Sequence, residues 1–586
     1  MFSFILSLSC LGATASAKTI VNNWDIGWTR ASPLHVERSV IGINGQWPNP
    51  PIEVDLGDRL VIHITNSLGN QSTGIHWHGI HQDGTNYMDG TTGATQCPIP
   101  PGGNYTYDFV INQPGSYWYH SHNMGQYPDG LRGTLIVHDP NAPYLNQIDG
   151  EFTVTLSDWY NEEMAPLIHT YESRLNENSN NGLEPIPAGG LINDAQNSTI
   201  CVEPNKTYLV RVINIASFLG HAFYFHDHWF TVVALDGVYI EETYIGESKN
   251  LRIAPGQRVD VLITTKNNTD QNYPILAILD INMFTPPEGY QPNITAYLVY
   301  NEEKPLPDQV SLYEFDFWDD STATPIDHQP LLDPPDHVFT LNTSFESIND
   351  IQRAVINNET YLAQSVPTLY TAITVGDEYA SNPTVYGQVN PHVVKYGEIV
   401  EIILNNMHYN LHPWHLHGHQ FQVYERALSH VGPFNGTSGN VSSIPARRDT
   451  VMLNENSYAR LRFQATNPGI YLFHCHVEWH VVSGLTATFI LAPELLSNVS
   501  IPKDHIAACE AYGMGYSGNA AGNEGTNMTG ANTQVSTYDQ GAMYPSTEKF
   551  FNKRFEKKPQ VQTQNNIQRG FPPSRPFRNR IIRKSI

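Results

Sequence analysis

Residues 54–66 read VDLGDRLVIHITN, and two later segments repeat the pattern. Residues 202–214 read VEPNKTYLVRVIN, and residues 394–406 read VKYGEIVEIILNN. Each segment begins with valine, passes through a turn-prone centre, and then alternates apolar and polar residues up to a closing asparagine. This alternation is typical of a half-buried strand that follows a turn. The repeat therefore predicts an all-β chain built from three related units.

A second repeat links the two ends of the chain. Residues 114–122 read PGSYWYHSH, and residues 468–476 read PGIYLFHCH, so Ser121 stands where Cys475 stands. We expect three β-sandwich domains over residues 18–145, 146–305 and 335–510, with the first and third as copies of each other.

Composition supports this architecture and excludes one class of partner. The 586 residues include 43 glycines and 40 prolines, and only 15% are charged, which favours short strands and turns over long helices. The formal net charge of -25 argues against a nucleic-acid-binding protein.

The N-terminus is typical of a secretory signal. Residues 1–11 are apolar, and Ala15-Ser16-Ala17 resembles a cleavage site, so residues 1–17 are predicted to be a signal peptide. No later apolar stretch is long enough to span a membrane, so we expect a secreted protein without a transmembrane segment, and a monomer. Glycosylation sequons fit an extracellular glycoprotein and occur at Asn70, Asn104, Asn197, Asn205, Asn293, Asn342, Asn435 and Asn498.

The C-terminal region changes composition. Residues 514–545 are rich in Gly, Asn, Thr and Ser, and residues 548–586 are rich in Lys and Arg. We expect a linker followed by a disordered basic tail over residues 514–586. An alternative is that the tail binds an acidic polymer of a cell wall.

The chain has five cysteines, and Cys10 would leave with the signal peptide. Cys475 lies between two histidines and is expected to ligate a metal, which leaves an odd number for disulfides. We favour a Cys97–Cys509 disulfide and expect Cys201 to be a buried free thiol.

Four His-X-His pairs carry the chemistry: His76/His78, His120/His122, His415/His417 and His474/His476. Residues i and i+2 of a strand share a face about 7 Å apart, so each pair presents two imidazoles on one side. Cys475, between the last two, must then point the other way. A fifth pair, in His226-Asp227-His228, has no partner cysteine and is expected to be structural.

A thiolate with two imidazoles is the ligand set of a blue-copper site. Cys475 supplies the sulfur, and His412 and His480 are close enough in sequence to supply the imidazoles. The other eight imidazoles suffice for three more metal ions. Four coppers store the four electrons that reduce O₂ to water, and Cys475 would pass them to His474 and His476.

The chain resembles the multicopper oxidases, in the branch of three-domain fungal laccases and iron-uptake ferroxidases. The resemblance covers about residues 18–510 and rests on six strings: Asn44-Gly-Gln-Trp-Pro, His76-Trp-His78-Gly, Tyr119-His-Ser-His122, His412-Pro-Trp-His-Leu-His-Gly-His419, Arg447-Arg-Asp-Thr450 and His474-Cys-His-Val-Glu-Trp-His480. It implies cupredoxin-like Greek-key domains and four coppers per chain.

The resemblance also implies residue roles. Type 1 copper would be held by His412, Cys475 and His480; type 2 by His76 and His415; and the type 3 pair by His78, His120, His122, His417, His474 and His476. The axial position of the type 1 site is Leu485, which cannot ligate and should raise the potential. Asp89 and Glu478 match acids that manage protons near the cluster.

The choice of reducing substrate should depend on the groups near His412 and His480. Iron-oxidising relatives place three carboxylates near the type 1 histidines, because hard cations prefer oxygen ligands. Glu184 matches the first, but the second falls on Thr285, with Asp280 nearby, and the third falls on His408. One carboxylate also suits a phenol oxidase, where it takes up the phenol proton.

We therefore expect a secreted laccase that oxidises phenols or aromatic amines with O₂. The alternative is a ferroxidase that oxidises Fe(II) to Fe(III). A more distant alternative is a secreted copper-binding protein without turnover, although copper storage would not need the relay through Cys475.

Overall fold

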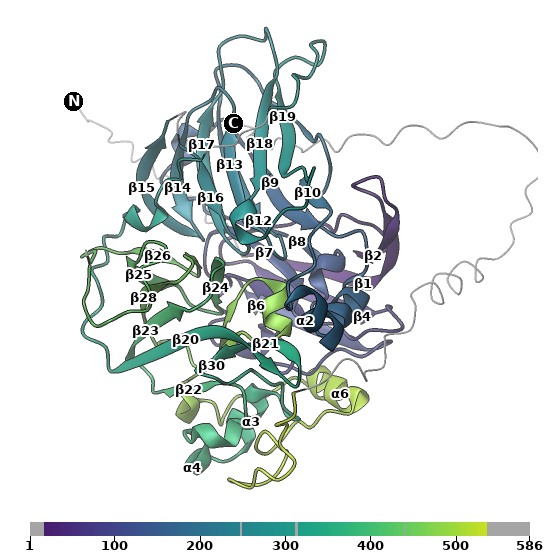
Figure 1. Cartoon of the computed structure of the whole chain (residues 1–586), viewed down its shortest axis with the longest axis vertical. Coiled ribbons are helices and arrows are strands. Elements are labelled where there is room, and N and C mark those ends of the chain that lie inside the picture. Colours follow the sequence, from purple (N-terminus) through teal and green to yellow (C-terminus); the bar gives the residue numbers. More distant parts are fainter. Residues whose placement is uncertain (1–16, 247–248, 311–314, 440, 536–586) are drawn as a thin grey trace, which may run out of the picture.

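The computed structural model describes residues 17–246, 249–310, 315–439 and 441–535. They form three β-sandwich domains, each made of two sheets (Figure 1). The first domain is purple and blue, the second occupies the top of the view, and the third is green. The predicted all-β class is confirmed.

The first domain has one sheet in the order β2-β1-β4-β6 and another in the order β3-β8-β7-β5. Its elements are β1 (Thr19–Ala31), β2 (Arg38–Ile43), β3 (Ile52–Asp55), β4 (Arg59–Asn66), β5 (Ile75–His78), η1 (Asn86–Met88), β6 (Asn104–Val110), β7 (Gly115–Ser121), η2 (Tyr127–Asp129), β8 (Arg132–His138) and η3 (Leu145–Gln147).

The second domain has sheets in the orders β10-β9-β12-β17-β14-β15 and β11-β19-β18-β13-β16. Its elements are β9 (Gly150–Trp159), α1 (Met164–Tyr171), α2 (Arg174–Asn180), β10 (Gly189–Ile192), β11 (Thr199–Cys201), β12 (Thr207–Asn214), β13 (His221–Phe225), β14 (Phe230–Leu235), β15 (Val238–Ile245), β16 (Leu251–Ile253), β17 (Arg258–Thr264), β18 (Tyr273–Leu279), η4 (Ile281–Met283) and β19 (Asn293–Val299), with η5 (Asp320–Thr322) in the following connection.

The third domain has sheets in the orders β21-β20-β23-β28-β25-β26 and β22-β30-β29-β24-β27. Its elements are β20 (His337–Ile348), β21 (Ile351–Ile356), α3 (Thr368–Thr374), α4 (Asp377–Ala380), η6 (Pro383–Tyr386), β22 (Pro391–Val394), β23 (Ile399–Asn406), β24 (His412–Leu416), β25 (Phe421–Arg426), β26 (Ala446–Arg448), β27 (Thr450–Leu453), β28 (Ser457–Gln464), β29 (Gly469–Cys475), α5 (Glu478–Val482), β30 (Thr486–Leu491), η7 (Pro493–Leu495) and α6 (Lys503–Tyr512).

The three sequence repeats form equivalent strands, β4, β12 and β23, each with one parallel and one antiparallel neighbour. Each strand ends in a buried asparagine: Asn66, Asn214 or Asn406. In all three, the side-chain amide donates to two backbone carbonyls, and the side-chain oxygen accepts from the amide two residues later. The closing asparagine is retained because it satisfies loop backbone groups that are shielded from water.

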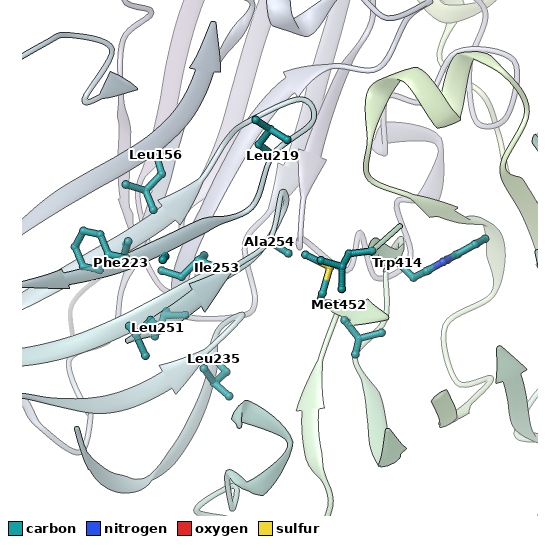
Figure 2. Packing of buried hydrophobic residues seen from close by; sticks show 14 of the residues in the cluster. Leu156, Leu219, Phe223, Leu235, Leu251, Ile253, Ala254, Trp414 and Met452 are labelled. Atoms are coloured by element: carbon teal, nitrogen blue, oxygen red, sulfur yellow. The ribbon is translucent and has the colours of Figure 1, made fainter. Parts of the chain in front are cut away.

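One buried apolar cluster continues from the second domain into the third. Its members run from Phe223 and Ile253 past Ala254 to Met452 and Trp414 of the third domain (Figure 2). Because burial of apolar surface contributes about 25 cal/mol per Å², this shared core holds the two domains together.

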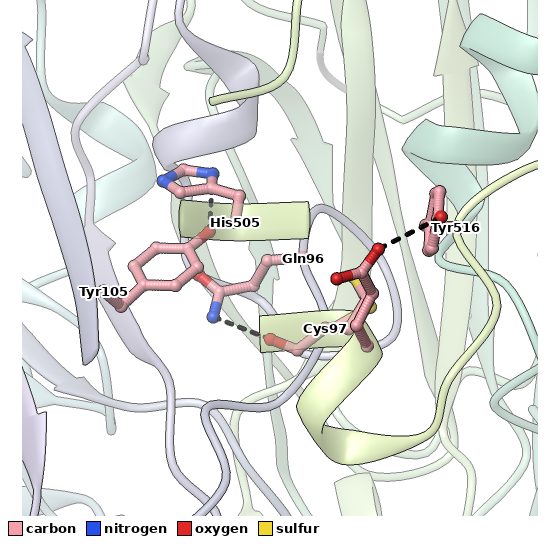
Figure 3. Close-up of a disulfide and its surroundings, with 7 residues drawn as sticks. Gln96, Cys97, Tyr105, His505 and Tyr516 are labelled. Carbon is pink, nitrogen blue, oxygen red and sulfur yellow. Dashed lines mark hydrogen bonds between the residues drawn. A yellow bond between two sulfur atoms is a disulfide. The ribbon is translucent and has the colours of Figure 1, made fainter. Parts of the chain in front are cut away.

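A disulfide ties the end of the chain to the first domain. Cys97 and Cys509 are bonded, as we expected, and this fixes α6 beside β6. The Tyr105 hydroxyl lies 2.8 Å from His505 Nδ1, next to the disulfide (Figure 3). The His505 Nε2 lies 3.0 Å from the carbonyl oxygen of Thr106.

The prediction that Cys201 is buried was wrong. Cys201 is exposed, because it is the last residue of β11, an edge strand of the five-stranded sheet. Its Sγ lies 3.7 Å from Glu302 Oε1.

Residues 514–535 pack against the third domain instead of forming the linker that we expected. Gly515 N donates to Ser365 O at 3.0 Å, and Asn532 N donates to Gln364 Oε1 at 3.1 Å. Asn519 Nδ2 donates to two backbone carbonyls within the segment, so asparagine side chains satisfy its turns. The basic tail and nearly all of the predicted signal peptide lie outside the described residues. Within the described part of the chain, no helix has both the length and the apolar character needed to cross a bilayer.

Buried ion pairs also cross the interface between the second and third domains. Arg258 donates to both carboxylate oxygens of Asp449, at 2.7 and 2.6 Å, and Arg448 Nε donates to Asp236 Oδ2 at 2.9 Å. All four side chains are buried. Such pairs are costly to break, because removing one partner leaves the other charge buried without compensation.

Replacing Arg258 with methionine should lower the melting temperature, measured by differential scanning calorimetry. Loss of one partner of a buried pair costs about 3–5 kcal/mol. The matched control is Arg59→Met, because Arg59 pairs with Asp108 at an exposed position and should matter little. Equal melting temperatures for the two variants would contradict the role assigned to Arg258.

Candidate metal centre

The eight paired histidines meet between the first and third domains. β5 and β7 are neighbours in the first domain, with His76 opposite His120. β24 and β29 are neighbours in the third domain, with His415 opposite His474. The repeated PG-x-Y-x-x-H-x-H strings thus place equivalent histidines on equivalent strands, and the two sets face each other.

Cys475 points away from this cluster, as the alternation along β29 requires. Its Sγ lies 3.5 Å from His412 Nδ1 and 3.3 Å from His480 Nδ1. All three side chains are buried. One sulfur and two nitrogens around a common point match the ligand set expected for type 1 copper.

The remaining histidines form a connected group. Three sets have all their candidate ligand atoms within 4.8 Å of one another: His76, His415 and His417; His76, His78 and His120; and His122, His417 and His474. His476 Nε2 lies 3.2 Å from His78 Nδ1, which brings in the eighth histidine. Every histidine predicted as a cluster ligand is therefore at this one place.

The ring nitrogens of this cluster are arranged to bind metal cations. The His474 Nδ1–H donates to the carbonyl of Cys475 at 2.9 Å, and the His417 Nδ1–H donates to Asp89 Oδ2 at 3.1 Å. Their Nε2 atoms therefore both carry lone pairs, yet they face each other 3.0 Å apart. Two lone pairs cannot bond to each other, whereas a metal ion between them satisfies both.

Four further ring nitrogens of the cluster are buried and have no hydrogen-bond partner among the described residues: His76 Nε2, His120 Nε2, His415 Nε2 and His476 Nδ1. In the first three rings the other nitrogen, Nδ1, lies within 3.0 Å of a backbone carbonyl oxygen, which fixes Nε2 as the acceptor. Burial lowers the pKa of His120, His417 and His474, which keeps the imidazoles neutral. Neutral buried imidazoles with a nearby thiol suit copper.

Asp89 orients two of these rings. It lies 3.3 Å from His76 Nδ1 and 3.1 Å from His417 Nδ1, and Thr91 donates to it at 2.7 Å. Burial raises the pKa of Asp89, but the two histidines lower it more, so the net pKa lies well below the usual range. An ionised carboxylate there fixes ring orientation and ligand basicity.

Asp449, like Asp89, lies beside two histidines of the cluster, and the sequence did not predict this position. Its Oδ1 lies 3.5 Å from His415 Nδ1 and 3.6 Å from His78 Nε2. The same carboxylate accepts from Arg258, so it links the cluster to the ion pairs between domains. The only available sequence clue was the family string at residues 447–450, which does not indicate this role.

A cavity of about 900 Å³ reaches the cluster from solvent, and His122 and Glu478 are among its lining residues. Burial raises the pKa of Glu478 to about 8. Its position at the first turn of α5 follows from the HCHVEWH string, which sets it between His476 and His480.

The type 1 histidines have different outer neighbours. Glu184 Oε1 lies 2.8 Å from His480 Nε2, and His408 Nδ1 lies 3.1 Å from His412 Nε2. Asp280 is buried, and Arg252 Nε donates to it at 2.7 Å, so it is already neutralised. Leu485 is buried in the same apolar cluster as Cys475, consistent with a non-ligating axial residue.

Comparison with known proteins agrees with this geometry. Multicopper oxidase family models match residues 25–142, 150–303 and 359–494. The iron transport multicopper oxidase fetC of Epichloe festucae is 46% identical over 530 residues, which cover 89% of this chain and 84% of the relative. The iron transport multicopper oxidase FET3 of Saccharomyces cerevisiae is 38% identical and covers 91% of this chain and 86% of its own length.

Solved structures give the same result. The crystal structure of Fet3p, described as a multicopper oxidase that functions in iron import, has a TM-score of 0.84 and 36% identity, covering 89% of this chain and 99% of its own. A laccase from Botrytis aclada has a TM-score of 0.73 and 28% identity, covering 85% and 92%. With its thiolate site and its eight-histidine cluster matching four copper ions, the chain belongs to the multicopper oxidase family.

Proposed function

We propose that this multicopper oxidase is a ferroxidase that oxidises Fe(II) to Fe(III) with O₂. The observation that carries the proposal is the contact between Glu184 Oε1 and His480 Nε2 at 2.8 Å. It places a carboxylate directly on a histidine of the type 1 site. Iron ions prefer hard oxygen ligands, and Fe(III) more so than Fe(II), so this carboxylate favours the oxidised product.

The tautomer of His480 provides a route for electrons from Glu184 toward Cys475. Its Nδ1 faces Cys475 Sγ at 3.3 Å and is therefore the lone-pair side, so the Nε2–H donates to Glu184. Burial raises the pKa of Glu184, but the hydrogen bond from His480 is among the contacts that lower it more, so the net pKa is below the usual value and the carboxylate stays ionised. An electron leaving iron on Glu184 would cross one hydrogen bond and one imidazole.

Copper at these sites supplies one-electron redox capacity and the binding of O₂. The protein supplies the electron path, the orientation of the ligands and the protons. Cys475 connects the outer site to His474 and His476 through the backbone of β29. Four Fe(II) ions give one electron each, and O₂ takes four electrons and four protons to form two waters. We assign Asp89 to orienting the cluster rings and Glu478, on the solvent cavity, to delivering protons.

The comparisons support iron over phenols as the reductant. The relatives that match along most of the chain are named iron transport multicopper oxidases, whereas the laccase structure is less similar in both sequence and TM-score. The expectation of a laccase from sequence rested on the missing second and third carboxylates.

That observation still favours phenol oxidation as a second candidate. Thr285 is exposed and cannot replace a carboxylate, and His408 stands beside His412 where an acid was expected. The Tyr290 hydroxyl donates to Pro187 O at 3.0 Å, which holds the loop of Thr285 next to the segment that carries Glu184. A single carboxylate suits a phenol as well as iron, because it can take up the phenol proton.

We also infer that the enzyme passes through the secretory pathway. The Cys97–Cys509 disulfide requires an oxidising compartment, and exposed sequon asparagines such as Asn205 and Asn498 are available for glycosylation.

Glu184→Gln should reduce kcat/KM for Fe(II) far more than for a simple phenol. The amide keeps the size and the contact with His480 but removes the charge. Interactions with a charged group are worth about 1.5–3 kcal/mol, which corresponds to about tenfold to hundredfold. The measurement is steady-state O₂ consumption with each reductant in parallel.

The control is Glu288→Gln, an exposed carboxylate on the loop that carries Thr285. It should leave both reactions unchanged. If wild-type protein turns over the phenol with much higher kcat/KM than Fe(II), the ferroxidase proposal is wrong and the second candidate takes its place.

Cys475→Ser should remove the blue absorption and one of the four copper ions per chain, as measured by absorption and metal analysis. Oxidation of either reductant should fall to background, because Cys475 is the sulfur ligand of the outer site and lies one residue from both His474 and His476 of the cluster. Cys201→Ser, at an exposed cysteine, is the matched control and should retain colour and activity. A Cys475→Ser protein that oxidises Fe(II) at the native rate would refute the electron route.

A further inference from the structure

The outer face of the six-stranded sheet in the second domain is only partly covered. The connection from the first domain packs Ala142 and Tyr144 against Leu209, Val233 and Leu262. Beyond that contact, Trp229 is 57% exposed and Tyr244 is 59% exposed. These two rings border a groove of about 520 Å³ that belongs to neither copper site.

The strand register places the groove residues on one face. Thr207 pairs with Thr264, and Thr231 pairs with Tyr244. Phe230 pairs with Ile263 and is buried, so Trp229, one residue earlier, lies on the opposite, outer face. The rings of Trp229 and Tyr244 meet edge to face, with centroids 5.8 Å apart.

The unused His-X-His motif explains why Trp229 points outward. The His228 Nδ1–H donates to the carbonyl of His226 at 2.8 Å, and the Tyr300 hydroxyl donates to His228 Nε2 at 2.7 Å. Both ring nitrogens of His228 are therefore satisfied inside the domain, as expected for a structural pair. The fixed turn holds the next residue, Trp229, on the surface.

The rim of the groove is polar. The Thr207 and Thr264 hydroxyls lie 3.0 Å apart, and Gln147 Nε2 donates to Glu242 Oε1 at 2.7 Å. Lys266 also lines the groove. Apolar ring faces surrounded by hydroxyl, amide and carboxylate groups match a pyranose, which has apolar C–H faces and a polar edge. A protein partner would need a larger contiguous apolar area.

A glycosylation sequon begins at the edge of this groove. Asn205-Lys206-Thr207 is a sequon, and its threonine is itself a groove residue. Asn205 is exposed, and its backbone N–H donates to the carbonyl of Lys266 at 3.0 Å. Thr207 and Trp229 are separated by two strand spacings, about 10 Å, which the first sugars of an N-linked chain can span.

We propose that Asn205 carries an N-linked glycan whose first sugars lie in this groove and cover Trp229 and Tyr244. In the modification, Asn205 Nδ2 loses a proton and bonds to C1 of N-acetylglucosamine, while the lipid pyrophosphate of a lipid-linked oligosaccharide donor leaves. The proposal needs passage through the secretory pathway but does not depend on whether Fe(II) or a phenol is the substrate.

The test uses the full-length secreted protein and its Asn205→Gln variant. Glycopeptide mass spectrometry should find Asn205 occupied. Hydroxyl-radical footprinting should label Trp229 several times less in the wild type than in the variant. Tyr396, which is 55% exposed in the third domain, is the internal reference and should be labelled equally in both. Iron oxidation should be equal in the two proteins.

Removal of a distant glycan is the matched control. Asn498→Gln lies in an exposed sequon of the third domain and should leave Trp229 labelling at the wild-type level. In thermal unfolding, Trp229→Ala should lower the melting temperature more in the wild type than in the Asn205→Gln background. The reason is that the stability effects of two groups in contact are not additive.

Three results would overturn the proposal. One is an unmodified Asn205 in the secreted protein, and another is equal Trp229 labelling with and without the Asn205 glycan. The third is Trp229-dependent binding of the wild type to an insoluble chitin or β-glucan, because the groove would then be open to an external polysaccharide.

Discussion

Two redox environments share one strand because neighbouring side chains of β29 face opposite sides of the sheet. Cys475 lies with His412 and His480, while His474 lies in the histidine cluster one residue away. The distance between the environments is therefore set by covalent backbone geometry and not by side-chain packing. Domain movements can alter access to either site, but they cannot lengthen this connection.

The cluster places many desolvated nitrogen atoms close together, and the surrounding residues are arranged to tolerate this. Burial keeps the rings neutral, and backbone carbonyls, Asp89 and Asp449 each fix which nitrogen carries hydrogen. Asp449 also receives two hydrogen bonds from Arg258 of the second domain. Site geometry and domain packing therefore depend on the same buried carboxylate, and the second domain supports the cluster without supplying a ligand to it.

Much of the fold and of the copper-ligand set could be predicted from the sequence, because the patterns that specify them are local. The two-residue period places ligands such as His76 and His78 together without knowledge of the fold. The repeated closing asparagines mark equivalent strands for the same reason, since each satisfies its own loops. Features that depend on distant segments were missed or misjudged. Asp449, which contacts histidines of two domains, was missed. Glu184 meets His480 across almost three hundred residues of sequence, and only the family resemblance indicated that the two residues lie close together.

Residue type predicted the wrong structure at two places, residues 514–535 and Cys201, and the contacts there give the physical reason. Glycine and asparagine in residues 514–535 suggested a linker, but asparagine side chains there bond to backbone groups and hold the segment on the third domain. Cysteine is usually buried, yet Cys201 ends an edge strand, where the sheet offers no cover.

The cluster draws its histidines equally from the first and third domains, which the whole second domain separates along the chain. A ribosome-bound chain that lacks its last domain holds only half of the ligands, and neither half forms a complete cage. The complete cluster can therefore form only after the third domain has been synthesised and has docked on the first. A product that ends before the third domain lacks four of the eight cluster histidines, so it cannot hold the full set of copper ions.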